Sequence, residues 1–141
     1  CSQCGRPLCS VPWLLCMLAE KYRICVMDDS LKHAGALIGQ SDPLIIISRL
    51  CYGGYSPGVK AVLDRAIGVS LPFFTWRGGQ THHMGRYPQR KLLRILFYGD
   101  CTESERQTAA ELAERNRLNL GYKTAETLFF QNPAQIRGAI S

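Results

Sequence analysis

Residues 43–66 read PLIIISRLCYGGYSPGVKAVLDRA, and this stretch decides the fold. Pro43 to Ser48 is an uninterrupted aliphatic run, typical of a strand covered on both faces in a parallel sheet. The glycine- and tyrosine-rich segment Arg49 to Tyr55 predicts a loop. Ser56 followed by Pro57 predicts the start of a helix, and Gly68 marks its end. Strand, loop and helix in this order predict one βα unit of an α/β protein.

The same alternation continues on both sides of this unit. We expect further strands over residues 22–27, 92–98 and 126–130. A helix is expected to follow Asp29 or Ser30 and to stop at Gly39. Thr102 and Glu105 form a capping-box pattern that predicts another helix, over 102–120, with Gly121 just beyond its end. The stretch 69–91, between the helix that ends near Gly68 and the strand expected over 92–98, has no regular period and is predicted to be a long connection.

These elements predict an α/β sandwich around a parallel sheet. Ligands of such sheets bind beyond the carboxyl ends of the strands. The loops expected to form a site are therefore 49–56 and 99–102.

Length, hydrophobic content and charge exclude some classes of protein and of partner. The 141 residues are 46% hydrophobic with a net charge of +6, which fits one domain over 1–141 with a cysteine-rich segment at 1–21. No apolar run approaches the roughly 18 residues of a membrane span, so we expect a cytoplasmic protein without a membrane partner. No acidic residue separates Asp64 from Asp100. This positive stretch suits cofactor phosphates or a partner subunit, and no nucleic-acid motif accompanies it, so we expect no nucleic-acid partner.

Four cysteines crowd the N-terminal segment with two, four and six residues between them: Cys1, Cys4, Cys9 and Cys16. Thiolates at short spacing suit iron or zinc. Their spacing matches neither a compact iron–sulfur run nor paired zinc knuckles. A bound cluster, zinc and unligated thiols therefore remain as alternatives.

The residues around the glycine pair resemble a known family. Ser48, then YGGYS, then Lys60, Asp64 and Arg65 resemble the segment after the third strand of flavodoxin-like NADPH-dependent FMN reductases and iron–sulfur flavoproteins. LPFF at 71–74, the pairs His82–His83, Arg86–Tyr87 and Arg115–Asn116, and Cys25 ahead of Asp28 and Asp29 extend the resemblance. Two departures are Arg49 where the family has proline and Cys51 where it has tyrosine.

The resemblance implies a flavodoxin-like three-layer sandwich that is incomplete at the N-terminus, because the family's first strand and phosphate loop would precede Cys1. It implies an FMN-dependent NAD(P)H oxidoreductase of the flavin- or quinone-reductase type, in which the flavin carries the hydride chemistry. The partners would be a small-molecule electron acceptor and further copies of the chain. The alternative is a non-enzymatic or truncated flavodoxin-like protein that acts through subunit association.

The resemblance also assigns residues. The flavin ring would lie between two loops that contain Leu50, Cys51, Tyr52, Gly53, Gly54, Tyr55 and Ser56, and Gly99, Asp100 and Cys101. The nucleotide phosphates or a neighbouring subunit would meet Arg77, Arg90, His82, His83, Arg86 and Tyr87. In related proteins an iron–sulfur cluster is held by a compact cysteine set, which corresponds here to Cys1, Cys4, Cys9 and Cys16. His82 and His83 are adjacent, so on a strand they would point to opposite faces and bind no metal jointly.

Overall fold

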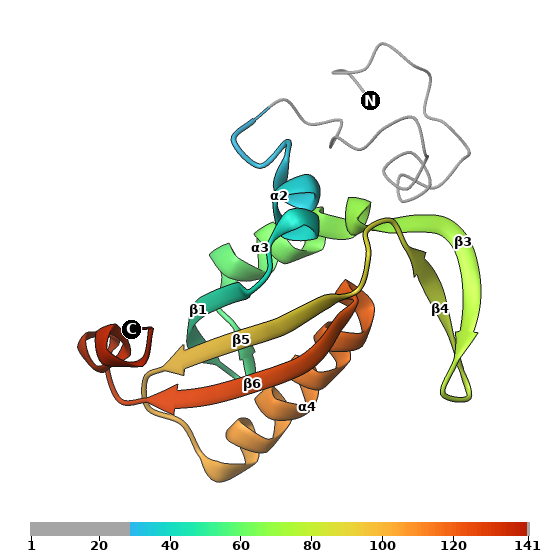
Figure 1. Cartoon of the computed structure of the whole chain (residues 1–141). Coiled ribbons are helices and arrows are strands. Elements are labelled where there is room, and N and C mark those ends of the chain that lie inside the picture. The colour runs from blue at the N-terminus through green and yellow to red at the C-terminus, as the bar shows by residue number, and fades with distance from the viewer. Residues whose placement is uncertain (1–28, 141) are drawn as a thin grey trace, which may run out of the picture. The chain divides into compact units, whose positions relative to one another are not determined.

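The computed structural model describes residues 29–140, which form two compact units (Figure 1). The first unit takes its described residues from 29–41 and Val62–Pro88, and the second from Asp42–Ala61 and 89–140. Helix α3 (Pro57–Arg65) contributes residues to both units. The strand predicted over 22–27 and the four clustered cysteines lie outside the described residues. The single domain over 1–141 remains a prediction.

The second unit contains a four-stranded sheet of order β2-β1-β5-β6. Its strands are β1 (Leu44–Cys51), β2 (Gly54–Tyr55), β5 (Arg90–Tyr98) and β6 (Tyr122–Phe130). β1 and β5 are parallel, as are β5 and β6, whereas β2 runs antiparallel to β1. The prediction of an α/β fold is confirmed. The prediction of a wholly parallel sheet is wrong, because the turn at Tyr52 and Gly53 brings the chain back along β1.

Helix α4 (Glu103–Leu120) packs along one face of this sheet (Figure 1). The predicted capping box is present: Glu105 N–H donates to the Thr102 hydroxyl at 3.3 Å, and Thr102 N–H donates to the Glu105 carboxylate at 2.8 Å. Ala109 and Ala113 are fully buried, since small side chains let a helix approach a sheet closely. Beneath the helix, the ring of Phe97 packs between those of Tyr55 and Phe129. A short 3-10 helix, η2 (Pro133–Ala139), follows β6.

β1 differs from its predicted environment. Ile46, Ser48 and Leu50 are buried, but Ile45 and Ile47, which alternate with them, are exposed. Within the described residues β1 therefore has one covered face, and the expectation of two covered faces is wrong there. An aliphatic run fixes the strand but not what covers each side, since alternate side chains point to opposite faces.

The first unit contains α2 (Ala34–Gln40), the end of α3, a 3-10 helix η1 (Ala66–Val69) and two strands. α2 begins later than predicted, because the Asp29 carboxylate accepts a hydrogen bond from Leu31 N–H at 2.9 Å and shapes a turn. The prediction that Gly39 stops this helix is also wrong. Gly39 lies inside α2, where the ring of Tyr87 occupies the space that a Cβ would need. Arg65 forms an ion pair with Asp29 at 2.5 Å.

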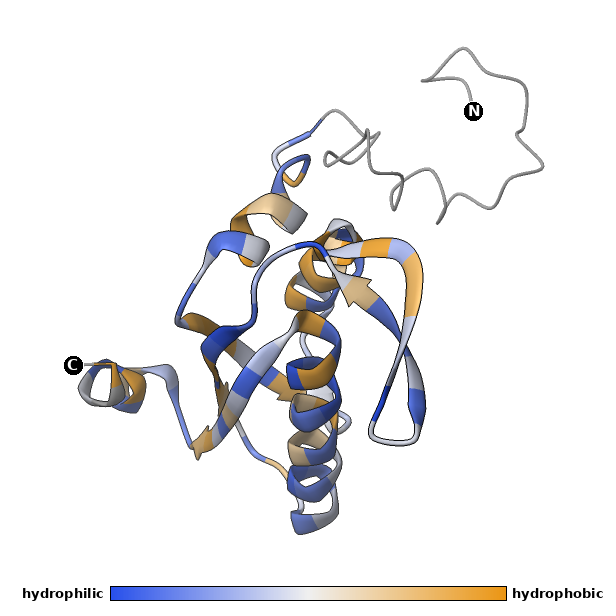
Figure 2. Cartoon of the chain, turned by 45° about the vertical axis from the view of Figure 1, so that its right-hand side comes forward, coloured by the Kyte–Doolittle hydropathy of each residue, from blue (hydrophilic) through white to orange (hydrophobic). Residues whose placement is uncertain are grey.

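A β-hairpin occupies most of the stretch predicted to be an irregular connection. β3 (Ser70–Arg77) pairs antiparallel with β4 (Gln80–Gly85). The two-residue turn Gly78–Gly79 has φ values of 56° and 79°, the positive pair that a type I′ hairpin turn requires. Pro72 and a register shift between Ser70 and Phe74 break the alternation along β3. Figure 2 shows hydrophobic residues in the first part of β3 and polar residues near the turn.

The described helices include none that is both long and apolar enough to cross a membrane.

The capping box makes stability depend on pH. Hydrogen bonds from the Thr102 N–H and then the Thr102 hydroxyl hold the pKa of Glu105 below its ordinary value of 4.5. A lowered pKa stabilises the fold above the unfolded value, and this contribution is lost as the pH falls through the folded value. We expect Glu105→Gln to destabilise the protein at pH 7 and the gap from wild type to shrink steadily below about pH 4.5. Urea unfolding at several pH values measures the difference in unfolding free energy between the two proteins. A difference that stays the same down to pH 2 would contradict the role given to the Glu105 carboxylate.

Candidate functional site

The two loops expected to form a site follow neighbouring parallel strands. β1 and β5 run side by side with Arg49 opposite Tyr98. The prediction of a loop over 49–56 is wrong in part, because residues 49–51 continue β1 and residues 54–55 form β2, whereas residues 99–102 follow β5 directly. Residues 50–56 are called the first loop below, and residues 99–101 the second. Because the carboxyl ends of parallel strands share one edge of a sheet, the two loops lie close together. The structure therefore places the two groups of residues predicted to flank a planar ring after neighbouring parallel strands.

The tip of the first loop is a two-residue turn. Tyr52 and Gly53 have φ values of 52° and 75°, and Cys51 pairs with Gly54 across the turn. A tyrosine at positive φ is uncommon. Tyr52 is 96% exposed, whereas Gly53 is buried against α4, where a Cβ would approach Thr108 to 2.9 Å. The turn is therefore anchored through Gly53 and presents the Tyr52 ring to solvent.

Two other predicted residues are part of the core. Leu50 and Tyr55 are buried. The Tyr55 hydroxyl accepts a hydrogen bond from the Asn116 side chain at 2.9 Å, and burial raises the pKa of Tyr55. Sequence reasoning noted Asn116 only within a family pattern. The structure gives it a role, because it ties α4 to the loop beyond β1.

Two predicted backbone donors bond within the protein. Ser56 N–H donates to the Ser48 hydroxyl at 2.9 Å, and Gly99 N–H donates to the Phe130 carbonyl at 3.0 Å. The amides left as candidates for a ligand are those of Tyr52, Gly53, Asp100 and Cys101. Asp100 is exposed, and the thiols of Cys51 and Cys101 are half-buried and free of disulfide bonds.

Arg49 is a residue that sequence reasoning missed as a participant. A Cβ at Gly99 would lie 3.6 Å from Arg49 Cγ and 3.9 Å from its Nε, so this exposed side chain passes beside the second loop. The signal was present in the sequence, since a positive charge interrupts an aliphatic strand. Its guanidinium adds a positive group at the edge where both loops meet.

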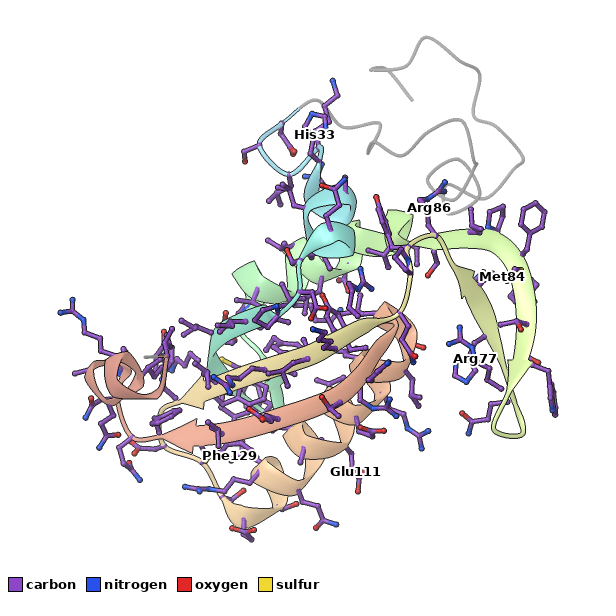
Figure 3. The ribbon with its side chains drawn as sticks, in the orientation of Figure 1. His33, Arg77, Met84, Arg86, Glu111 and Phe129 are labelled. Carbon is purple, nitrogen blue, oxygen red and sulfur yellow. The ribbon has the colours of Figure 1, made fainter. Side chains whose placement is uncertain are left out.

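Apart from Arg90, the second predicted group belongs to the first unit. Arg90 lies at the start of β5 in the second unit, where it is buried and donates to the Leu120 carbonyl, so the expectation that it meets nucleotide phosphates is wrong. Arg86 Nε donates to the Gly68 carbonyl at 3.0 Å, and Tyr87 packs on Gly39. His82 and His83 lie on β4, and the His83 ring packs on Phe74 with centroids 4.5 Å apart. Arg77, at the end of β3, is exposed, and Figure 3 labels it together with Met84 and Arg86. Of this group, Arg77 is the residue best placed to meet a ligand from solvent.

Over residues 29–140, no group of three or more His, Cys, Asp or Glu side chains is arranged to hold a metal ion. The predicted ligands Cys1, Cys4, Cys9 and Cys16 lie outside this range.

Comparisons of the chain with protein-family models, with curated proteins and with solved structures found no match.

Ser48 holds the base of the first loop. Its buried hydroxyl accepts from Ser56 N–H and donates to the Arg49 carbonyl at 2.9 Å. We expect Ser48→Ala to lower the free energy of unfolding by about 1–3 kcal/mol, because the Ser56 amide loses its acceptor. Ser41→Ala is the control, since its hydroxyl donates to the Leu37 carbonyl at an exposed site and should change stability by less than about 0.5 kcal/mol. Urea unfolding of both variants measures the difference; equal values would contradict the role given to Ser48.

Proposed function

We propose that the protein is an FMN-dependent NAD(P)H oxidoreductase of flavodoxin-like fold, acting as a homo-oligomer on a small-molecule electron acceptor. The observation that carries the proposal is the pair of adjacent loops at the carboxyl edge of β1 and β5, with Tyr52 fully exposed at one tip. The sequence resemblance over 41–65 supports the same assignment. The sheet also contains three neighbouring parallel strands, β1, β5 and β6, as each half of a doubly wound sheet does.

The loop residues fit a planar, hydrogen-bonding ring. An exposed aromatic side chain such as Tyr52 can stack on an isoalloxazine. Amides of Tyr52, Asp100 and Cys101 can donate to its carbonyl oxygens and ring nitrogens. The Arg49 guanidinium places positive charge at the same edge and favours an anionic ligand. FMN, when bound, supplies the hydride chemistry, and the protein's contribution is to bind and orient it.

Flavin binding tests the proposal directly. FMN is titrated into the full chain while its fluorescence is followed, and the absorbance of the protein is recorded after desalting. We expect quenching and a retained visible flavin band. Tyr52→Asn should weaken affinity at least tenfold without loss of fold, because asparagine tolerates positive φ and Tyr52 has no core contact to lose. Phe73→Ser, an exposed aromatic on β3, is the control and should bind as wild type does. No retained band together with no change in fluorescence would overturn the proposal.

The alternative, a non-enzymatic flavodoxin-like protein that acts through association, is favoured by a different observation. Phe74 and Trp76 are largely exposed on the β3–β4 hairpin, and exposed aromatic side chains of this size are typical of interaction surfaces. Absence of flavin binding together with concentration-dependent association would favour this alternative over the enzyme.

A further inference from the structure

One face of the β3–β4 hairpin is aromatic. Phe74 pairs with His83 and Trp76 with Thr81, and residues paired across an antiparallel ladder share a face. Phe74, Trp76, Thr81 and His83 therefore form one surface, which we call the aromatic face. Phe74 is 64% and Trp76 is 71% exposed. The opposite face contains Thr75, Arg77, Gln80 and His82, by the same pairing.

An exposed aromatic face on a two-stranded hairpin indicates a surface that packs against a partner. A two-stranded hairpin is marginally stable in water on its own, and it gains stability when a face packs against another surface. Aromatic side chains are also enriched at the centres of protein interfaces and supply most of their binding energy. The aromatic face therefore has the composition of an interface.

Charge decides between the possible partners. The aromatic face contains no Asp, Glu, Lys or Arg, because Arg77 lies on the opposite face. Two copies can therefore meet through this surface around a two-fold axis without bringing like charges together. An acidic protein partner would find no cation on this face. A membrane surface rich in anionic lipids would likewise find no cation on this face to bind its headgroups.

We propose that the aromatic face is a self-association surface that joins the hairpins of two copies in an isologous dimer. The proposal names the surface for the homo-oligomer of the proposed function, and it requires no flavin. Aromatic side chains bury about 150–250 Å² each, so the exposed parts of four rings contribute about 400–650 Å². This is less than the roughly 1,200 Å² of a stable interface, so the dimer dissociates on dilution.

The test uses the full chain without flavin in analytical ultracentrifugation over a wide range of concentration. The mass is expected to rise from 15.8 kDa toward twice that value. Trp76→Ser should raise the dissociation constant at least tenfold. Leu37→Ser is the matched control for loss of an exposed apolar side chain, because Leu37 is as exposed as Phe74 but lies on α2, and it should leave the constant unchanged.

A second pair of variants keeps both aromatic rings and separates the two faces. Thr81→Arg adds a charge to the aromatic face, and two like charges would meet in the dimer, so it should also weaken association at least tenfold. Gln80→Arg adds the same charge to the adjacent, exposed position on the opposite face and should have little effect. Circular dichroism verifies that each variant is folded.

Three results would overturn the proposal: a wild-type protein that stays monomeric at every concentration, equal effects of Thr81→Arg and Gln80→Arg, or binding to phosphatidylserine vesicles that Trp76→Ser abolishes in a protein that does not self-associate. FMN titration of the same variants keeps the two proposals apart. Variants that no longer self-associate but still bind FMN support the role of the aromatic face in self-association and show that the flavin site does not depend on it. A self-associating protein that binds no FMN overturns the proposed function alone.

Discussion

Replacing Gly53 by alanine is expected to lower the free energy of unfolding by about 3 kcal/mol. Two costs add at this position. A non-glycine residue at its φ of 75° costs about 1–2 kcal/mol. The new Cβ would also lie 2.9 Å from Cβ and Cγ2 of Thr108, and overpacking of this kind costs about 1–3 kcal/mol. Because Thr108 belongs to α4, the change separates the first loop from the helix that anchors it.

Two other glycines make this prediction specific. Gly79 has nearly the same φ, 79°, but no atom of the described chain lies within 4 Å of a Cβ built there, so Gly79→Ala should cost only about 1 kcal/mol. Gly58, in α3, has open space and ordinary helical φ, so Gly58→Ala should stabilise by about 0.4–1 kcal/mol. Urea unfolding gives all three values. Equal losses for Gly53→Ala and Gly79→Ala would show that contact with Thr108 does not restrain the loop.

Arg90→Met is expected to cost about 2–4 kcal/mol. The Arg90 side chain is buried at the start of β5, where its guanidinium donates to the Leu120 carbonyl at the end of α4 and lies 4.5 Å from the centroid of the Tyr122 ring. Loss of the cation leaves a helix end without its positive partner and removes a desolvated cation–π contact. The part-buried Leu120 carbonyl also loses its donor, which adds to the cost.

Arg94→Met is the matched control four residues along the same strand. Arg94 pairs with Glu126 at 2.7 Å on the surface, and exposed ion pairs contribute about 0–1 kcal/mol. Arg90→Lys should recover less than half of the lost unfolding free energy, because the lysine ammonium lacks the planar group that a guanidinium stacks on the Tyr122 ring. Thermal and urea unfolding rank the three variants. A loss for Arg94→Met as large as that for Arg90→Met would contradict the role given to the buried guanidinium.

Local signals predicted their elements well. Helix α4 begins and ends where Thr102, Glu105 and Gly121 indicate, because capping depends on residues within a few positions of each other. β1 was predicted from its aliphatic run but continues three residues further, to Cys51, because pairing with β2 extends the ladder beyond the hydrophobic residues. The hairpin was missed although a two-glycine turn is a hairpin signal, since the register shift near Pro72 hides the alternation before it.

The site was predictable in part for the same reason. That the loops after β1 and β5 approach each other follows from the parallel-strand rule. The contacts that shape the loops depend on α4, which comes fifty residues later in the chain. The burial of Gly53 against Thr108 and the bond from Asn116 to Tyr55 arise from this packing, and no pattern within residues 49–56 specifies them.

The Gly78–Gly79 turn also has a practical use. Its surroundings are open, and the residues on either side are polar and exposed. Tips of this kind accept inserted residues readily, because no packed side chain has to move. A short tag or a fluorescent amino acid inserted between the two glycines would leave the paired strands in place. The turn is therefore a suitable position for a reporter on this hairpin, for immobilising the protein, or for opening the chain in a circular permutation.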